Sequence, residues 1–402
     1  MASVLPFAAV MAGEHAVQVA TLPYDVMNRA EAAAMAAGNP LSFLHVTRSE
    51  IDLPEGLGPY DDAVYAQAAK AWRALREGTL GQDEVESYYV YSLVRNGLRQ
   101  TGVVATPTVD DYDRDLIRKH ERTRKEKEDD RTRHISTLRA QTGPVFLTYR
   151  DSSAINAIVS RAMSGPALFD FTAEDGIRHS GWRVPAADTA GLRQAFAQVP
   201  LLYIADGHHR AASASRARAS LAAAGAPGES DRFLAVIFPA GQLHILPYNR
   251  LVLDLNGLTP PAFRAALADI AAVRPVSSGT PNRPGTVCMF LESQWWEMVF
   301  AADPTASPLD ALDVSILQDR VLQPLLGIDD PRTSHRIDFV GGIRGLGELE
   351  RRVGQGEAAV AFSMFPTTVA QLMAIADAGQ IMPPKSTWFE PKLRDGLFVH
   401  EI

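Results

Sequence analysis

The chain is poor in cysteine and has no long apolar run. Cys288 is the single cysteine among 402 residues, which excludes an intrachain disulfide and any zinc or iron–sulfur site that needs several thiolates. The apolar stretch at residues 1–13 is interrupted by Glu14, well short of the roughly 20 residues that cross a membrane. We therefore expect a cytoplasmic protein without a membrane partner.

Positive charge is also scarce. The chain has 39 Lys and Arg residues against 47 Asp and Glu residues, a formal net charge of -8. Such a balance gives no general attraction for the phosphate backbone of a nucleic acid, so binding DNA or RNA would need a local basic patch. We expect small-molecule partners and no nucleic acid, and the sequence leaves the oligomeric state open.

Two common nucleotide-binding fingerprints are missing. No G-x-G-x-x-G follows a predicted strand, and no G-x-x-x-x-G-K-[ST] occurs anywhere in the chain. The first motif binds dinucleotides and the second cradles nucleotide phosphates. A phosphate ligand must therefore be bound in another way.

What the sequence does contain is an alternation of strand and helix patterns, which predicts a mixed α/β (α+β) fold. Shifts in pattern predict three α/β regions, 1–109, 110–254 and 255–402. The apolar and β-branched runs predict strands at 88–93, 145–149, 201–205, 233–238, 243–247, 251–255, 287–291 and 297–301. Helical spacing predicts helices at 26–37, 60–77, 211–224, 311–325, 345–353 and 367–378.

Residues 110–141 carry many charges of both signs and lack proline, which predicts one solvated helix. A salt-bridged surface face is one reading of this helix. The other is functional: the stripe that begins at Tyr112 and Leu116 continues into His120 and Thr123, as a helix does when it enters a site. Glu121 beside His120 is a candidate general base for a hydroxyl nucleophile.

The clearest chemical signal is the run from Asp206 to Arg210, D-G-H-H-R, where a predicted strand meets a helix. A helix N-terminus presents unpaired N–H groups and partial positive charge, and Gly207 allows a close approach of the backbone. Arg210 adds a forked donor that suits phosphate. The segment therefore predicts a phosphate site with His208 and His209 as further contacts.

Other roles for these residues stay open. The histidine pair could bind a metal, or one imidazole could be part of the core. Asp206 could be the N-cap of the helix, or it could orient a histidine or hold a divalent cation.

Two loops add further candidates. Residues 382–392 place Lys385, Ser386, Thr387 and Lys392 among prolines, an arrangement that would suit oxyanion binding. The turn at residues 23–26 contains Tyr24 and Asp25. Either loop could instead be a plain surface turn.

Six motifs together resemble the prokaryotic family called domain of unknown function 1015, over essentially the whole chain. They are L-P-Y-D-V (22–26), G-N-P-x-S-F-L-H-V (38–46), D-Y-D-R-D-L-I-R-K-H-E-x-T (111–123), K-E-x-D-R (127–131), Y-I-A-D-G-H-H-R (203–210) and M-P-P-K-S-T-x-F-x-P-K-L (382–393). D-G-H-H-R is also similar to the phosphate-binding box of the ParB/sulfiredoxin-like superfamily, and especially of its free serine kinases.

The resemblance implies a ParB/sulfiredoxin-like core with N- and C-terminal α/β elaborations. It implies a kinase that transfers a phosphoryl group from ATP, ADP or pyrophosphate to free L-serine and gives O-phosphoserine. Mg²⁺ is expected with the donor. The implied residues are Glu121, His120, Asp206 and His209 for catalysis, Gly207, His208, His209, Arg210, Lys385, Ser386, Thr387 and Lys392 for phosphate, Tyr24, Asp25, Thr123 and Arg131 for substrate, and Asp206 for the metal.

Two other classes of function share these features. A ParB-like nucleotide-binding switch associated with DNA has the same box, but it would need a basic DNA-binding region that this acidic chain lacks. A phosphoester hydrolase, or a phosphate-binding module without turnover, would use the same anion site.

Overall fold

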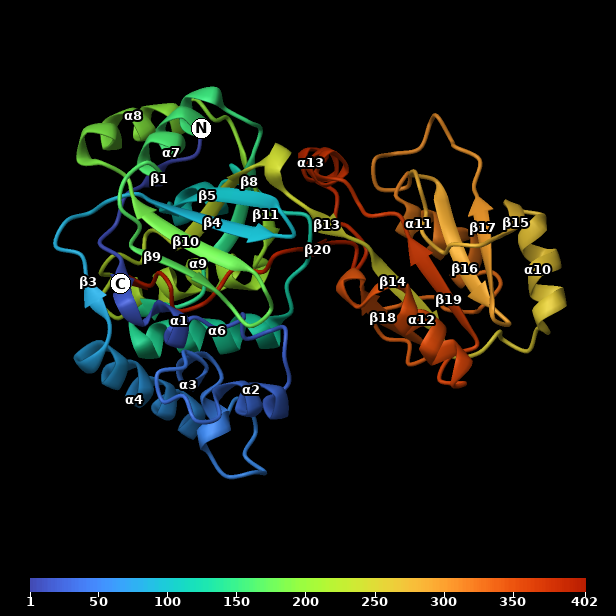
Figure 1. Cartoon of the computed structure of the whole chain (residues 1–402), viewed down its shortest axis with the longest axis horizontal. Coiled ribbons are helices and arrows are strands. Elements are labelled where there is room, and N and C mark those ends of the chain that lie inside the picture. The colour runs from blue at the N-terminus through green and yellow to red at the C-terminus, as the bar shows by residue number, and fades with distance from the viewer. The chain divides into compact units, whose positions relative to one another are not determined.

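The computed structural model describes residues 1–402, which form two units (Figure 1). The first unit contains Met1–Leu243 together with Pro391–Ile402, and the second contains His244–Glu390. The chain therefore leaves the first unit and returns to it for the residues after Glu390. The three-region division at residues 109 and 254 stays a prediction.

A mixed nine-stranded sheet organises the first unit. Its strands are β1 (Val4–Leu5), β4 (Tyr89–Arg95), β5 (Leu98–Pro107), β6 (Ile117–Arg118), β8 (Val145–Tyr149), β9 (Phe169–Thr172), β10 (Arg178–Arg183), β11 (Leu202–Asp206) and β12 (Ala235–Pro239). They follow the order β6-β11-β8-β12-β5-β4-β10-β9, and β1 pairs with β5. β11 is parallel to β6 and antiparallel to β8. The end of β11 therefore lies beside the segment that follows β6.

Helices and two short strand pairs complete the first unit. The helices are α1 (Ala16–Val19), α2 (Arg29–Ala36), α3 (Leu44–Thr47), α4 (Asp62–Gly78), α5 (Val109–Asp113), α6 (Lys125–Leu138), α7 (Ser153–Ala162), α8 (Ala186–Phe196) and α9 (His208–Ala223). β2 (Val10–Met11) pairs with β3 (Gly81–Gln82), and β7 (Ala140–Gln141) pairs with β21 (His400–Glu401). Buried Leu147, Ile204, Ile155 and Phe196 belong to one apolar core that joins the sheet to α7 and α8.

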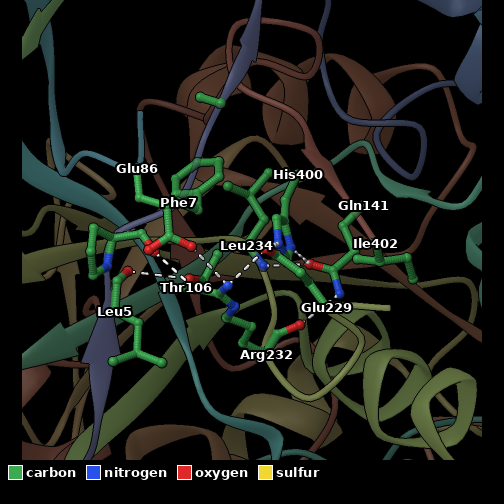
Figure 2. A network of polar contacts seen from close by, with 12 residues as sticks. Leu5, Phe7, Glu86, Thr106, Gln141, Glu229, Arg232, Leu234, His400 and Ile402 are labelled. Atoms are coloured by element: carbon green, nitrogen blue, oxygen red, sulfur yellow. Dashed lines mark hydrogen bonds and ion pairs between the residues drawn. The ribbon is translucent and has the colours of Figure 1, made fainter. Parts of the chain in front are cut away.

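Polar contacts around His400 hold the returning segment, residues 391–402, against the rest of the first unit (Figure 2). Nδ1 of the buried His400 ring lies 3.1 Å from Oε1 of Gln141, and Nε2 lies 2.9 Å from the carboxylate of Glu229. Arg232 pairs with the same carboxylate at 2.9 Å. The segment is thus part of the first unit's fold, although it is far from the rest of that unit in sequence.

The second unit has its own sheet and core. Six antiparallel strands follow the order β15-β17-β16-β19-β14-β18, and Leu251, Phe290 and Trp295 are among the buried residues of its core. Its strands are β13 (Ile245–Leu246), β14 (Tyr248–Val252), β15 (Ala272–Val276), β16 (Thr286–Leu291), β17 (Gln294–Val299), β18 (Ile337–Gly341), β19 (Val360–Met364) and β20 (Trp388–Phe389). Its helices are α10 (Pro260–Ala268), α11 (Asp313–Leu317), α12 (Gly345–Gly354) and α13 (Val369–Asp377).

The mixed α/β class is confirmed, and several elements coincide with their prediction, among them β8, α4 and α12. The long strand β5, with Gly102 and Thr101 in its first half, was not predicted. The ParB/sulfiredoxin-like core stays a prediction. No helix of the structure combines the length and the apolar character needed to cross a membrane.

The single helix predicted over residues 110–141 is wrong. The segment forms α5, then β6, then a loop at residues 119–124, and only then α6. Leu202 donates its N–H to the carbonyl of Leu116 at 3.0 Å, and β6 pairs with β11. Pairing with the sheet therefore overrides the local helical pattern, and it places His120 and Glu121 in a loop.

Candidate functional site

The strand-to-helix connection at Gly207 forms the centre of the candidate site. Gly207 is the N-cap of α9 and has φ +94°, in the left-handed region. A Cβ atom on it would lie 2.9 Å from Nε of Arg210. Glycine is therefore required at this turn, both for its backbone angle and for the approach of the arginine. The predicted N-cap role of Asp206 is wrong, because Asp206 ends β11 instead.

The loop after β6 covers the first turn of α9. The N–H of His120 donates to Nε2 of His208 at 3.3 Å, and the N–H of Arg124 donates to Nε2 of His209 at 3.0 Å. A ring nitrogen that accepts a hydrogen bond carries no proton, so both imidazoles are neutral and carry their proton on Nδ1. Burial, the first cause, lowers the pKa of His208 and also that of His209.

Glu121 and His120 both contact the His208 ring. The Glu121 carboxylate lies 3.7 Å from Nδ1 of His208, and its side chain is 51% exposed. The His120 ring meets the His208 ring edge-on, with centroids 4.4 Å apart. Burial lowers the pKa of His120 to about 4, so this ring is neutral as well. Glu121 thus faces solvent next to two neutral imidazoles.

Asp206 binds two cations. Its carboxylate accepts a hydrogen bond from Nζ of Lys392 at 2.7 Å and lies 3.7 Å from the Arg210 guanidinium. Burial opposes the ionised form, but Lys392 and Arg210 outweigh it and hold the pKa of Asp206 below its ordinary value. The structure therefore brings together Lys392 from the returning segment and the D-G-H-H-R turn.

Arg210 points from α9 into a small cavity. Its guanidinium donates to the carbonyl of Pro144, while its buried Nε has no hydrogen-bond partner. The cavity measures about 30 Å³, and residues of the returning segment, α6 and the N-terminal turn line it, among them Asp395, Arg131 and Tyr24. This volume has room for about two water-sized groups.

The predicted substrate contacts lie around or near this cavity. The Arg131 guanidinium stacks on the Tyr24 ring at 4.2 Å and pairs with Asp130 at 2.8 Å. Asp25 is exposed, and its charge raises the pKa of Arg210. Thr123 donates its hydroxyl to Glu128. Tyr24 and Arg131 therefore lie at the cavity, whereas Thr123 is held by α6.

Lys385, Ser386 and Thr387 belong to the second unit. Lys385 lies over the Tyr248 ring at 5.4 Å, and its backbone has φ +57°. Ser386 donates its hydroxyl to the carbonyl of Pro383 at 2.7 Å. The first unit assembles its site without these residues, and their role in binding phosphate stays a prediction.

Sequence reasoning missed Asp395. This carboxyl is 1% exposed, lines the cavity and has one buried oxygen without a hydrogen-bond partner. Burial raises its pKa to about 7. The only signal in the sequence is its closeness to Lys392 in a segment already singled out for its lysines.

No group of three or more His, Cys, Asp or Glu side chains is arranged to hold a metal ion. Asp206 offers a single carboxylate, which two cations already contact. A protein-built metal cage therefore does not fit this site. A Mg²⁺ ion held mainly by the phosphates of a ligand would need no more than one or two carboxylates from the protein.

One comparison with known proteins identifies the family. The family model described as "Protein of unknown function (DUF1015)" matches residues 4–315. No curated protein matches the chain.

Among solved structures, a free serine kinase mutant in complex with AMP is 12% identical, with a TM-score of 0.35, and the match covers 72% of this chain and 87% of that chain. A conserved hypothetical protein from Pyrococcus furiosus is 15% identical, with a TM-score of 0.35, and 73% of this chain and 93% of that chain are covered. SbnI from Staphylococcus aureus, with a C-terminal truncation, is 12% identical, with a TM-score of 0.38, and 73% of this chain and 85% of that chain are covered.

Proposed function

The chain belongs to the DUF1015 family, whose description assigns no activity, and from the chemistry of its site we propose that it is a small-molecule kinase. The proposed reaction transfers a phosphoryl group from ATP, ADP or pyrophosphate to the hydroxyl of free L-serine and gives O-phosphoserine. The observation that carries this proposal is the convergence of Lys392, Arg210 and two neutral imidazoles on the N-terminus of α9.

This arrangement suits a phosphoryl group. Phosphoryl transfer needs positioning and neutralisation of charge more than covalent chemistry by the protein. The first turn of α9 supplies N–H groups and partial positive charge, and Gly207 lets oxygen atoms approach them. Lys392 and Arg210 supply full charges, and Lys385, Ser386 and Thr387 remain candidates for the same ligand. Mg²⁺ bound to the donor phosphates, with Asp206 as its proposed protein ligand, would neutralise further charge.

Glu121 is the proposed general base. Its exposed carboxylate can accept the proton of the serine hydroxyl while the new O–P bond forms and the bond to the leaving phosphate breaks. Nδ1–H of His208 lies 3.7 Å from this carboxylate, and His120 packs against His208. His209, fixed by the N–H of Arg124, is a further contact for the transferred group.

The acceptor is proposed to lie over the cavity beside Arg210. Tyr24, Asp25, Thr123 and Arg131 are its proposed contacts. Small size favours serine over larger hydroxyl compounds, because the cavity of about 30 Å³ admits only a small head group.

The test is direct detection of the product. Purified protein with Mg²⁺ and L-serine is incubated in turn with ATP, ADP and pyrophosphate, and O-phosphoserine is measured by mass spectrometry. We expect product with at least one donor, and product with none of them contradicts the kinase.

A pair of variants tests the base. Glu121→Gln should abolish product and keep donor binding, whereas Glu126→Gln, an exposed residue of α6, should behave as wild type. Donor binding without product would favour a phosphate-binding module, and release of phosphate from added O-phosphoserine would favour a hydrolase. A salt-sensitive shift of duplex DNA would favour the ParB-like switch.

A further inference from the structure

The cavity beside Arg210 holds two buried polar atoms without partners. Nε of Arg210 is a donor and Oδ1 of Asp395 is an acceptor, and both side chains line the same cavity. A buried donor or acceptor without a partner costs about 1–3 kcal/mol. A ligand or a water molecule that offers both an acceptor and a donor would therefore satisfy both atoms.

Asp395 is the only carboxylate that lines the cavity. Of the two cations at the cavity, Arg131 pairs with Asp130 at 2.8 Å, and Arg210 lies 3.7 Å from Asp206, which also binds Lys392. Asp395 has no ion pair of its own, and only a backbone hydrogen bond from Tyr24 and more distant charges act on it. In this cavity Oδ1 of Asp395 is therefore an acceptor that still lacks a donor.

Hydrogen bonds with the N-terminal region hold the backbone of Asp395 in place. The backbone of Asp395 exchanges two hydrogen bonds with Thr21, at 2.9 and 3.2 Å. A Cβ atom on Gly143 would lie 2.9 Å from Oδ1 of Asp395. Glycine at this position thus leaves open the space in front of the oxygen that has no partner.

We infer that Asp395 binds the α-ammonium group of the acceptor and thereby selects amino acids among small hydroxyl compounds. A primary ammonium group is close to a water molecule in size, so the cavity admits it together with one neighbouring atom. It donates to Oδ1 of Asp395, while Nε of Arg210 faces an acceptor of the same ligand. This inference rests on the proposed function, because it names how the acceptor of that reaction is recognised.

An ammonium group bound at Asp395 changes the protonation of this carboxyl. Burial raises the pKa of Asp395 to about 7, so the carboxyl is partly protonated at neutral pH. An ammonium group at hydrogen-bond distance stabilises the carboxylate, so binding lowers this pKa and releases a proton to solvent. We expect release of about half a proton for each serine bound at pH 7.

The experiment measures the binding of three ligands to the full chain by calorimetry, without a phosphoryl donor. L-serine has both charged groups, ethanolamine lacks the carboxylate, and 3-hydroxypropionate lacks the ammonium. Wild type should bind 3-hydroxypropionate about 10- to 100-fold more weakly than L-serine, the usual effect of losing a charge-assisted hydrogen bond. Equal affinity for these two ligands overturns the inference.

Variants sharpen the result. Asp395→Asn should weaken serine about 10- to 100-fold, leave 3-hydroxypropionate unchanged and abolish proton release between buffers of different ionisation enthalpy. The control is Asp313→Asn, at another buried carboxyl, in the second unit, and it should bind serine as wild type does. Unchanged serine affinity in Asp395→Asn contradicts the assignment, and if that variant does not fold, the ligand series on wild type decides.

The binding results and the phosphoserine assay test the ammonium site and the kinase activity separately. Serine that binds with the expected dependence on its ammonium, but gives no phosphoserine with any donor, overturns the kinase and keeps the ammonium site. Phosphoserine formation with equal affinity for serine and 3-hydroxypropionate keeps the kinase and overturns the ammonium site.

Discussion

The two units differ in how they treat buried charge. Three Asp, Glu, His, Lys or Arg residues are buried in the second unit, namely Arg250, Asp313 and Glu390. Eleven are buried in the first: Glu50, Asp111, His120, Asp130, His134, His179, His208, Arg210, Arg394, Asp395 and His400. Burying an ionisable group is unfavourable unless a partner compensates it. The first unit therefore buries more ionisable groups than the second, and four of them, His120, His208, Arg210 and Asp395, belong to the candidate site.

The largest expected effect comes from making the same change in both units. Arg210→Met leaves Asp206 and Asp395 with less compensating charge, so we expect a loss of about 3–5 kcal/mol of stability. Arg250 donates only to carbonyls, those of Tyr248 and Lys385, so Arg250→Met should cost about 1–3 kcal/mol. Urea unfolding of both variants measures the difference, and equal losses would remove the contrast between the units.

Asp395 should make the first unit sensitive to pH. Because burial raises the pKa of Asp395 from 3.8 to about 7, the folded state binds more protons than the unfolded state between these values. Stability contributed by this carboxyl is therefore present in acid and is lost as the pH rises from about 4 to 7, by about 4 kcal/mol in all. Asp395→Asn should flatten this part of the stability profile. A profile identical to that of wild type would show that Asp395 is ionised in the folded protein without such a cost.

Asp313 gives the matching test in the second unit. Burial raises the pKa of Asp313 to about 6, against one hydrogen bond from the N–H of Gly285. The same sign applies, with a loss of about 3 kcal/mol between pH 4 and 6. Asp313→Asn keeps the oxygen that accepts from Gly285 and removes the pH dependence. Since no ligand is expected at Asp313, adding serine should shift the pH dependence of stability that comes from Asp395 and leave the part that comes from Asp313 unchanged.

The smallest effect is expected at an exposed ion pair. Arg336 donates to Asp254 at 2.9 Å, and their side chains are 33% and 52% exposed. Solvent-exposed pairs contribute less than about 1 kcal/mol. Asp254→Asn should therefore change the free energy of unfolding by less than that, and less still in high salt. A larger change would show that this ion pair contributes more to the stability of the second unit than exposed pairs usually do.

Much of the fold and part of the site could be predicted from the sequence. The strand that ends at Asp206, the glycine turn and the helix that carries His208, His209 and Arg210 follow from local patterns, because strand and helix periodicity and glycine at a turn act within a few residues. The contact between Lys392 and Asp206 also joins two motifs that the sequence had singled out.

What could not be predicted depends on contacts between distant segments. The helical pattern at residues 110–141 gives way to β6 because Ile117 pairs with Leu202, and local charge spacing carries no information on that pairing. Asp395 becomes notable only once the cavity encloses it. The short returning segment has no pattern that reveals the unit to which it belongs.

That returning segment bears on the order of events during synthesis. Residues 391–402 carry Lys392 and Asp395, yet the ribosome makes them only after the whole of His244–Glu390. The first 243 residues can form the sheet while the nascent chain is still growing, since domains generally fold as they emerge. The candidate site cannot close at that stage. The place of residues 391–402 in the first unit therefore stays vacant until the second unit has been synthesised.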